Sequence, residues 1–162
     1  MTKNLDKEGL RSIAHKYELF YVDIWGVVHN GINIYENAII ALKEMLKLKK
    51  DFVLLTNAPR PNKNVRNFCE KLGMDKALLN YVFTSGEAAL SYLRKNLFSE
   101  KFFHVGPPRD FDLFSDFKKN KTNNIEDASY LLCTGLFDDQ KTDLNFYKDI
   151  LESSVSKKMI CT

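Results

Sequence analysis

The chain has 162 residues, of which 44% are hydrophobic and 28% are charged, so it can bury a core and is not a disordered polymer. Its 24 basic and 21 acidic residues are interspersed and leave a net charge of +3, which argues against a nucleic-acid-binding protein. The sequence shows no signal peptide, no membrane span and no metal-ligand spacing among its three cysteines and three histidines, so we expect a cytoplasmic protein with free thiols.

Helical and extended patterns alternate along the chain, which is typical of a parallel sheet with crossover helices. Residues 5–17 are expected to form a helix that leads into a strand over 19–25. Apolar residues then recur at helical spacing over 36–49, and the apolar run after them predicts a strand over 52–56. This order predicts a fold of the α/β class.

Asp23 interrupts an apolar run, residues 20–28, that otherwise has the pattern of a fully buried strand. A carboxylate in such a run costs on the order of several kcal/mol unless a cation, a metal or hydrogen-bond donors meet it. Gly26 and the turn residues 29–31 indicate that the strand ends just after Asp23. The run therefore predicts a binding or catalytic site at that strand end. The alternative is that Asp23 caps the following turn or pairs with a core Lys or Arg.

Thr56 and Asn57 follow the second strand and supply a hydroxyl and an amide, which suit phosphate binding. Ligands of open parallel sheets bind outside the carboxyl ends of the strands, so these side chains and Asp23 are expected to face the same crevice. Ordinary turn and capping chemistry is the alternative explanation for Thr56 and Asn57.

Further elements are expected along the rest of the chain. Pro61 suits the first turn of a helix that Gly73 ends. Alternating and apolar runs predict strands over 81–84, 102–105, 130–133 and 159–161, and helices over 87–96 and 146–151. The polar, Asn-rich segment 118–127 is expected to be a loop. Arg109 follows a proline-rich turn, where it either contacts a phosphate or is simply exposed.

Five segments in colinear order resemble motifs of the haloacid dehalogenase (HAD) superfamily of phosphohydrolases, and in particular its subclass IIA or NagD-like branch with Asp-x-Trp-Gly in the first motif. They are residues 23–31, 55–61, 84–87, 104–110 and 132–139. The resemblance implies a Rossmann-like core whose N-terminal half is residues 1–90. It also implies that residues 91–162 are part of an inserted α/β cap domain.

The resemblance assigns roles to four residues. Asp23 matches the nucleophile, which forms an aspartyl-phosphate that water then hydrolyses. Asp23 and the backbone carbonyl of Trp25 match the positions that bind Mg²⁺. Thr56 and Asn57 match the motif that holds the substrate phosphate. The implied function is that of a phosphohydrolase acting on a small phosphorylated metabolite, such as a sugar phosphate or a nucleotide.

Trp25 departs from the family pattern, because it stands where the general acid–base Asp is usual. An indole cannot transfer a proton near neutral pH. The alternative function is therefore a non-catalytic phosphate- or Mg²⁺-binding interaction module with the same fold. A general nucleotide-binding domain is a third interpretation, but the sequence has no Gly-rich phosphate loop.

The Lys and the acidic pair of the family's later motifs have no counterpart here. Lys157 and Lys158 fall in the cap segment and are expected to flank a strand, and Asp138 and Asp139 are expected in a loop or at a helix N-terminus. The sequence stops in an apolar run where relatives continue, so we expect an N-terminal portion with little activity alone. Its unpaired strand edges and apolar faces would favour a homo-oligomer, and we expect no nucleic-acid or membrane partner.

Overall fold

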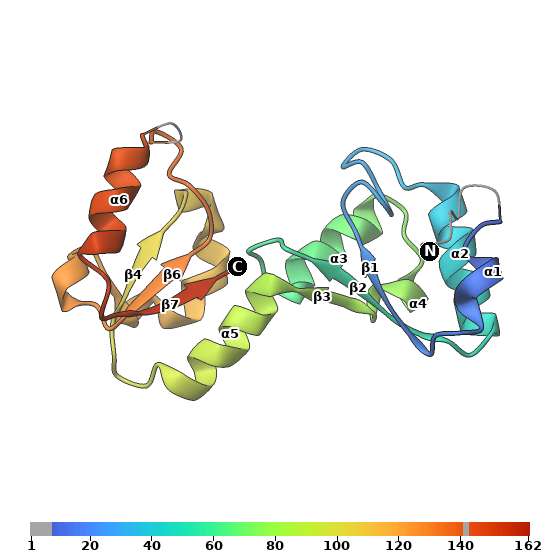
Figure 1. Ribbon diagram of the computed structural model, residues 1–162, viewed down its shortest axis with the longest axis horizontal. Helices are drawn as coiled ribbons and strands as arrows, with labels where there is room; N and C mark the ends of the chain where they lie inside the picture. Colours follow the sequence, from blue (N-terminus) through green and yellow to red (C-terminus); the bar gives the residue numbers. More distant parts are fainter. Residues whose placement is uncertain (1–7, 141–142) are drawn as a thin grey trace. The chain divides into compact units, whose positions relative to one another are not determined.

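The computed structural model describes residues 8–140 and 143–162. The chain forms two compact units, one of Met1–Thr56 and Arg66–Phe83 and one of Asn57–Val65 and Thr84–Thr162. Each unit has its own β-sheet and helices (Figure 1), which confirms the predicted α/β class. The division into a core, 1–90, and a cap, 91–162, stays a prediction. Within the described ranges, no helix combines the length and apolar character that a membrane crossing requires.

The first unit is built on a three-stranded sheet of order β1-β2-β3. Its strands are β1 (Leu19–Asp23), β2 (Asp51–Thr56) and β3 (Val82–Thr84). β1 and β2 are parallel, and their register pairs Asp23 with Leu55. The crossover between them contains α2 (Glu36–Lys47), which buries Leu42 and Met45. The predicted strand–helix–strand order is therefore confirmed, with ends that differ by one or two residues.

The remaining helices of this region are short. They are α1 (Arg11–Ala14), α3 (Asn62–Lys71) and α4 (Lys76–Leu79). The helix expected over 5–17 is wrong in extent, because α1 has only four residues and residues 5–7 lie outside the described ones. A turn at Gly9, with φ of 66°, precedes it. Only Ala14 of this helix is buried, and a helix gains most of its stability from packing.

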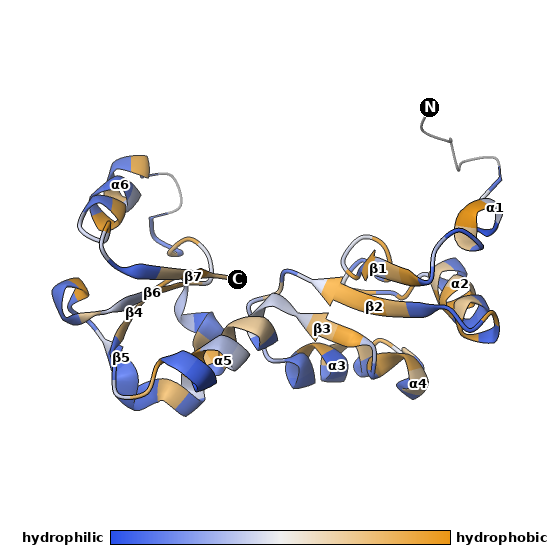
Figure 2. Cartoon of the chain, turned by 60° about the horizontal axis from the view of Figure 1, so that its bottom comes forward, coloured by the Kyte–Doolittle hydropathy of each residue, from blue (hydrophilic) through white to orange (hydrophobic). Residues whose placement is uncertain are grey.

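One face of the first sheet is exposed apolar surface. Tyr21 is 70% exposed, Leu55 41% and Phe83 40%, and Figure 2 shows that hydrophobic residues dominate the three strands. Exposed and half-buried residues alternate along β1. The expectation of a fully buried strand is therefore wrong, since the period of two puts Asp23 on the open side. Its side chain is exposed to solvent there.

We predict that this exposed face drives self-association of the chain. Replacing Tyr21 and Leu55 by Ser should lower the association constant measured by sedimentation velocity, because both side chains lie on the open face. Leu144→Ser is the matched control, since Leu144 is 80% exposed and lies outside this sheet. A chain that stays monomeric at high concentration would contradict the prediction.

The second unit contains a four-stranded sheet of order β5-β4-β6-β7, in which every paired strand is parallel. Its elements are β4 (Phe102–Val105), β5 (Lys121–Thr122), β6 (Tyr130–Cys133), β7 (Lys158–Cys161), the helices α5 (Ser85–Asn96) and α6 (Leu144–Glu152), and the 3₁₀ segments η1 (Pro108–Asn120) and η2 (Ile125–Asp127). Phe102, Phe114 and Tyr130 are the largest buried residues of its core. The loop expected over 118–127 is wrong in part, because Lys121 and Thr122 pair with Phe102 and Phe103 as a strand.

His104 is buried in the second unit, with its Nε2 atom 2.8 Å from Thr134 Oγ1. Burial, assisted by the charge of Lys121, lowers the pKa of this imidazole from 6.5 to about 4. The folded protein therefore keeps His104 neutral at pH values where the unfolded chain protonates it.

This difference predicts that the free energy of unfolding falls as the pH is lowered from 6.5 towards 4. Between these values the unfolded state binds more protons, and the loss reaches roughly 3 kcal/mol. Urea unfolding at pH 7, 5.5 and 4.5 measures the effect. The carboxylates also respond in this range, so His104→Gln is the comparison. An equally steep pH dependence in that variant would show that His104 is not the cause.

Candidate functional site

Asp23 and Thr56 lie at the carboxyl ends of neighbouring parallel strands of the first unit. Asp23 is the last residue of β1 and pairs with Leu55, which directly precedes Thr56, the last residue of β2. The structure thus brings these two predicted site residues to one edge of the sheet. Asn57 is the next residue along the chain and begins the second unit. Asp23 and Thr56 thus lie at the carboxyl ends of the strands, the edge at which ligands of parallel sheets bind.

The backbone after Asp23 turns sharply and is fixed by hydrogen bonds. The Oδ1 atom of Asp23 accepts a 2.8 Å hydrogen bond from the Ile24 backbone N–H. Ile24 is buried, and its carbonyl accepts hydrogen bonds from the backbone N–H groups of Val27, Val28 and His29. Val28 is fully buried as well. The buried side chains of Ile24 and Val28 therefore anchor the turn, and this fixes the position of Asp23 at its start.

Trp25 lies exposed on this turn, with 63% of its surface accessible. Its ring stands edge-on to the His29 ring, with centroids 5.4 Å apart. Gly31 leaves room for the Trp25 ring, because a Cβ added to Gly31 would come within 2.5 Å of that ring. The φ of Gly31, 90°, also favours glycine at this point. The side chain at the usual acid–base position is thus an indole packed on the turn, and it offers only an N–H donor.

His29 does not replace the missing acid–base group. Burial lowers the pKa of its imidazole, and Nδ1 accepts a 3.0 Å hydrogen bond from the Gly31 backbone N–H. The ring also contacts Phe68 edge-on, with centroids 5.5 Å apart. These contacts give His29 a structural role, which agrees with the sequence-based assignment of this segment to a turn.

The segment after Thr56 and Asn57 is held by the start of α5, within the second unit. The Ala58 carbonyl accepts hydrogen bonds from the Gly86 backbone N–H and the Ser85 hydroxyl, both at 3.2 Å. The Arg60 carbonyl accepts one from the Thr84 hydroxyl at 2.6 Å. These hydrogen bonds fix the backbone over residues 58–60.

Side chains reinforce the same junction. Thr84 caps α5 by accepting from the Glu87 N–H at 2.9 Å. The Glu87 carboxylate instead accepts from the Asn62 N–H at the start of α3, at 3.0 Å, while Asn62 Oδ1 accepts from the Thr84 N–H at 2.9 Å. These roles of Thr84, Glu87 and Asn62 were not predicted from the sequence. The spacing Thr84-x-x-Glu87 is the signature of a capping box and was the available signal.

Gly86 is the point of closest approach in this junction. A Cβ added there would lie 2.4 Å from the Arg60 backbone N and 2.5 Å from its O atom. We therefore predict that Gly86→Ala lowers the free energy of unfolding by about 1–3 kcal/mol, because backbone atoms must move. Urea unfolding tests this, with Ser91→Ala on the same helix as the control. Equal stability of the two variants would contradict the prediction.

The other charged residues singled out in the sequence have structural partners. Arg109 forms an ion pair with Asp138, which raises the pKa of the guanidinium. Two roles were predicted for Arg109, a phosphate contact and an exposed turn residue, and this ion pair fits the second better. Asp138 lies in a turn, as expected. Lys157 donates to the Ala128 carbonyl at 2.8 Å, and Lys158 begins β7. Each of these four residues therefore has a structural place of its own in the second unit.

The donors around Asp23 fit Mg²⁺ in part. Among the described residues, no group of three His, Cys, Asp or Glu side chains gathers as a metal site. Asp23 offers an exposed carboxylate with Oδ2 not used by the Ile24 N–H. Mg²⁺ is commonly held by one or two carboxylates, with water and substrate oxygens completing the shell. The donor set thus agrees with the hard-oxygen chemistry of that ion.

Comparison with known proteins gives one family match and several structural matches. The sequence profile described as "Haloacid dehalogenase-like hydrolase" matches residues 20–118. No curated protein sequence matches the chain significantly. A haloacid dehalogenase-like hydrolase from Brucella suis superimposes with a TM-score of 0.74 and 28% identity, covering 99% of this chain and 59% of that one.

Two further structures show the same fold at lower identity. NagD from Escherichia coli has 19% identity and a TM-score of 0.53, covering 85% of this chain and 51% of that one. A glycerol phosphate phosphatase from Mycobacterium tuberculosis, in complex with magnesium, has 19% identity and a TM-score of 0.54, covering 76% and 38%. The chain therefore spans about half the length of these structures, or less.

Proposed function

Because this chain belongs to the haloacid dehalogenase-like hydrolase family, with the fold of its NagD-like subclass IIA branch, we propose that it serves in the hydrolysis of small phosphate monoesters. The observation that carries the proposal is the placement of Asp23 and Thr56 at neighbouring strand ends. An exposed carboxylate can act as the nucleophile in phosphoryl transfer from an ester in solution. A neighbouring hydroxyl can donate a hydrogen bond to a phosphate oxygen.

In the proposed reaction, an oxygen of Asp23 attacks the phosphorus atom and the bond to the ester oxygen breaks. The leaving alkoxide takes a proton from solvent water and becomes the alcohol. A water molecule then attacks the aspartyl-phosphate and gives up a proton to solvent, which releases phosphate and restores the carboxylate. Thr56 and Asn57 would hold the phosphate oxygens that do not transfer. Asp23 and the Trp25 carbonyl would hold Mg²⁺, which neutralises charge on the phosphoryl group. The magnesium complex of the mycobacterial phosphatase supports that choice of ion.

Phosphate release from a panel of sugar phosphates, nucleoside monophosphates and phenyl phosphate tests the proposal. We expect release that depends on Mg²⁺ and stops when EDTA is added. The panel should be assayed with this chain and with any longer protein that contains it, because the chain covers only 59% and 51% of two solved structures of this fold. No release from any ester in either protein would count against hydrolysis.

A non-catalytic role is the second candidate, and Trp25 favours it. Its ring occupies the acid–base position and packs on the turn, so the chain could bind phosphate or Mg²⁺ without turnover. Beryllium fluoride separates the two functions, because it forms a phosphate-like adduct on a nucleophilic aspartate. An adduct that requires Asp23 favours hydrolysis, whereas Mg²⁺ binding without any adduct favours the binding module.

We also propose a cytoplasmic location. The cysteines Cys69, Cys133 and Cys161 are free, which suits a reducing compartment. Burial and the neighbouring Cys161 raise the pKa of Cys133 to about 12, so this thiol stays protonated and unreactive near neutral pH. Fractionation of cells that express the native gene tests the location.

A further inference from the structure

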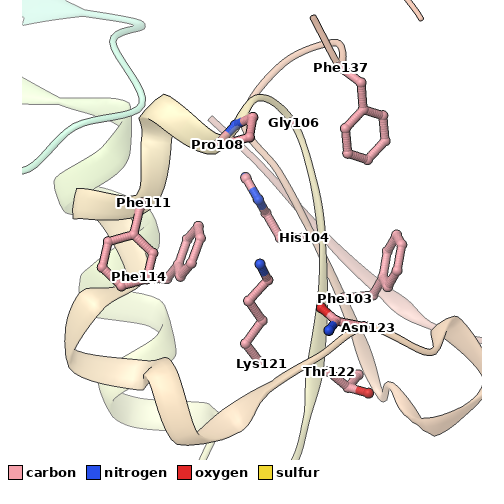
Figure 3. A pocket seen from close by; sticks show the side chains of 10 residues that line it. All are labelled: Phe103, His104, Gly106, Pro108, Phe111, Phe114, Lys121, Thr122, Asn123 and Phe137. Carbon is pink, nitrogen blue, oxygen red and sulfur yellow. The ribbon is translucent and has the colours of Figure 1, made fainter. Parts of the chain in front are cut away.

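The second unit contains a cleft of about 380 Å³ between η1 and the strands β4 and β5. Its volume lies within the roughly 300–1,000 Å³ that small-molecule sites occupy. Figure 3 shows the side chains of Lys121 and His104 in its middle and phenylalanines on both sides. Every residue that lines the cleft belongs to the second unit, whereas Asp23 and Thr56 belong to the first.

The cleft carries a positive charge without a counter-charge. None of its ten lining residues is acidic. The Lys121 ammonium lies over the ring face of Phe114, 5.3 Å from the ring centroid. His104 is neutral near pH 7 and adds no charge. An ammonium group so placed attracts an anion, since nothing in the lining offsets it.

Aromatic rings form both walls. Phe111 and Phe114 lie on one side and Phe103 and Phe137 on the other (Figure 3). Phe111, which is 42% exposed, presents ring surface on the first side. The buried Phe114 ring supports it edge-on at 5.1 Å between centroids and packs on His104 at 4.6 Å. Rings fixed in this way gain contact area with a flat ligand at little conformational cost.

We propose that this cleft binds a small anion carried on a flat apolar ring, with its anionic group at Lys121 and its ring between the phenylalanines. Asn123, which also lines the cleft, offers an amide donor for the same group. Aryl phosphonates, phosphates and carboxylates share this chemistry. The site goes beyond the proposed hydrolysis, because it uses none of the residues assigned to that reaction.

Phenylphosphonate is the probe, because it carries both features and cannot be hydrolysed at its P–C bond by the proposed reaction. Isothermal titration of the 162-residue chain without Mg²⁺ measures its affinity. Inorganic phosphate lacks the ring and benzyl alcohol lacks the charge, and each is expected to bind at least roughly tenfold more weakly. NMR signals of the His104 imidazole report whether the ligand sits in the cleft.

Variants locate the site. Lys121→Met keeps an apolar stem over Phe114 and removes the charge. It should therefore lower the affinity for phenylphosphonate roughly fivefold to tenfold. Lys118→Met is the matched control, since Lys118 is exposed on η1 and does not line the cleft. Phe137→Leu should weaken binding without changing the affinity for inorganic phosphate. Circular dichroism confirms that each variant is folded.

The outcomes are distinct. Weaker binding by Lys121→Met, with Lys118→Met and Asp23→Asn unchanged, supports the cleft. If Asp23→Asn changes the affinity for phenylphosphonate and Lys121→Met does not, the proposal of a binding cleft at Lys121 is wrong. The ligand then binds at the proposed hydrolytic site. Equal binding of phenylphosphonate and phosphate, or no binding at all, would also overturn the proposal of a binding cleft. None of these results depends on phosphatase activity, so the two proposals fail separately.

Discussion

Asp23→Asn is expected to lower Mg²⁺-dependent phosphate release at least about a thousandfold, because the amide is not a nucleophile for phosphorus. The substitution removes one charge and keeps the side-chain shape. Asp23 is exposed and its Oδ1 accepts a hydrogen bond from the Ile24 backbone N–H, an interaction that the amide oxygen of Asn can also make. We therefore expect little change in the free energy of unfolding.

Asp51→Asn is the matched control for this variant. Asp51 begins β2, at the opposite edge of the sheet from Thr56, and is also exposed. Its substitution should leave phosphate release and the beryllium fluoride adduct unchanged. Asp23→Asn should abolish both. A D23N variant that still released phosphate at the wild-type rate would move the chemistry away from β1.

Hydrophobic patterns predicted most elements, but they described the surroundings of Asp23 wrongly. The strands 102–105 and 130–133 coincide with β4 and β6, whose residues are mostly buried, so continuous apolar runs mark them clearly. β1 has a similar run yet is half exposed. Apolar composition alone does not reveal whether a second layer covers both faces of a strand.

The sequence located the strand-end residues but not the contacts that hold them. Asp23 and Thr56 could be predicted because each follows an apolar run, and parallel pairing brings such ends together. The contact of Gly86 with the Arg60 backbone joins segments 26 residues apart, and the cleft at Lys121 depends on a two-residue strand. Such features come from tertiary packing, which has no local pattern to read.

Trp25→Asp should raise Mg²⁺-dependent turnover by roughly a hundredfold to ten-thousandfold, because it restores a proton-transfer group at the acid–base position. The change is feasible structurally, since Trp25 is 63% exposed. Ile24 and Val28 remain buried and continue to anchor the turn. Steady-state phosphate release across pH 5 to 9 measures the effect, and the new carboxyl group should change its pH dependence.

Trp25→Asn separates proton transfer from steric relief. Asn has nearly the size of Asp and also removes the indole from its place against His29 and Gly31, but it neither gives nor takes a proton. An increase in Trp25→Asp alone means that the absence of a proton-transfer group at this position limits turnover. An equal increase in both variants means that the ring blocks the ester. If neither variant gains activity while both still bind phosphate, the family fold has been kept for binding, since an intact nucleophile and a restored acid–base group would then be insufficient for turnover.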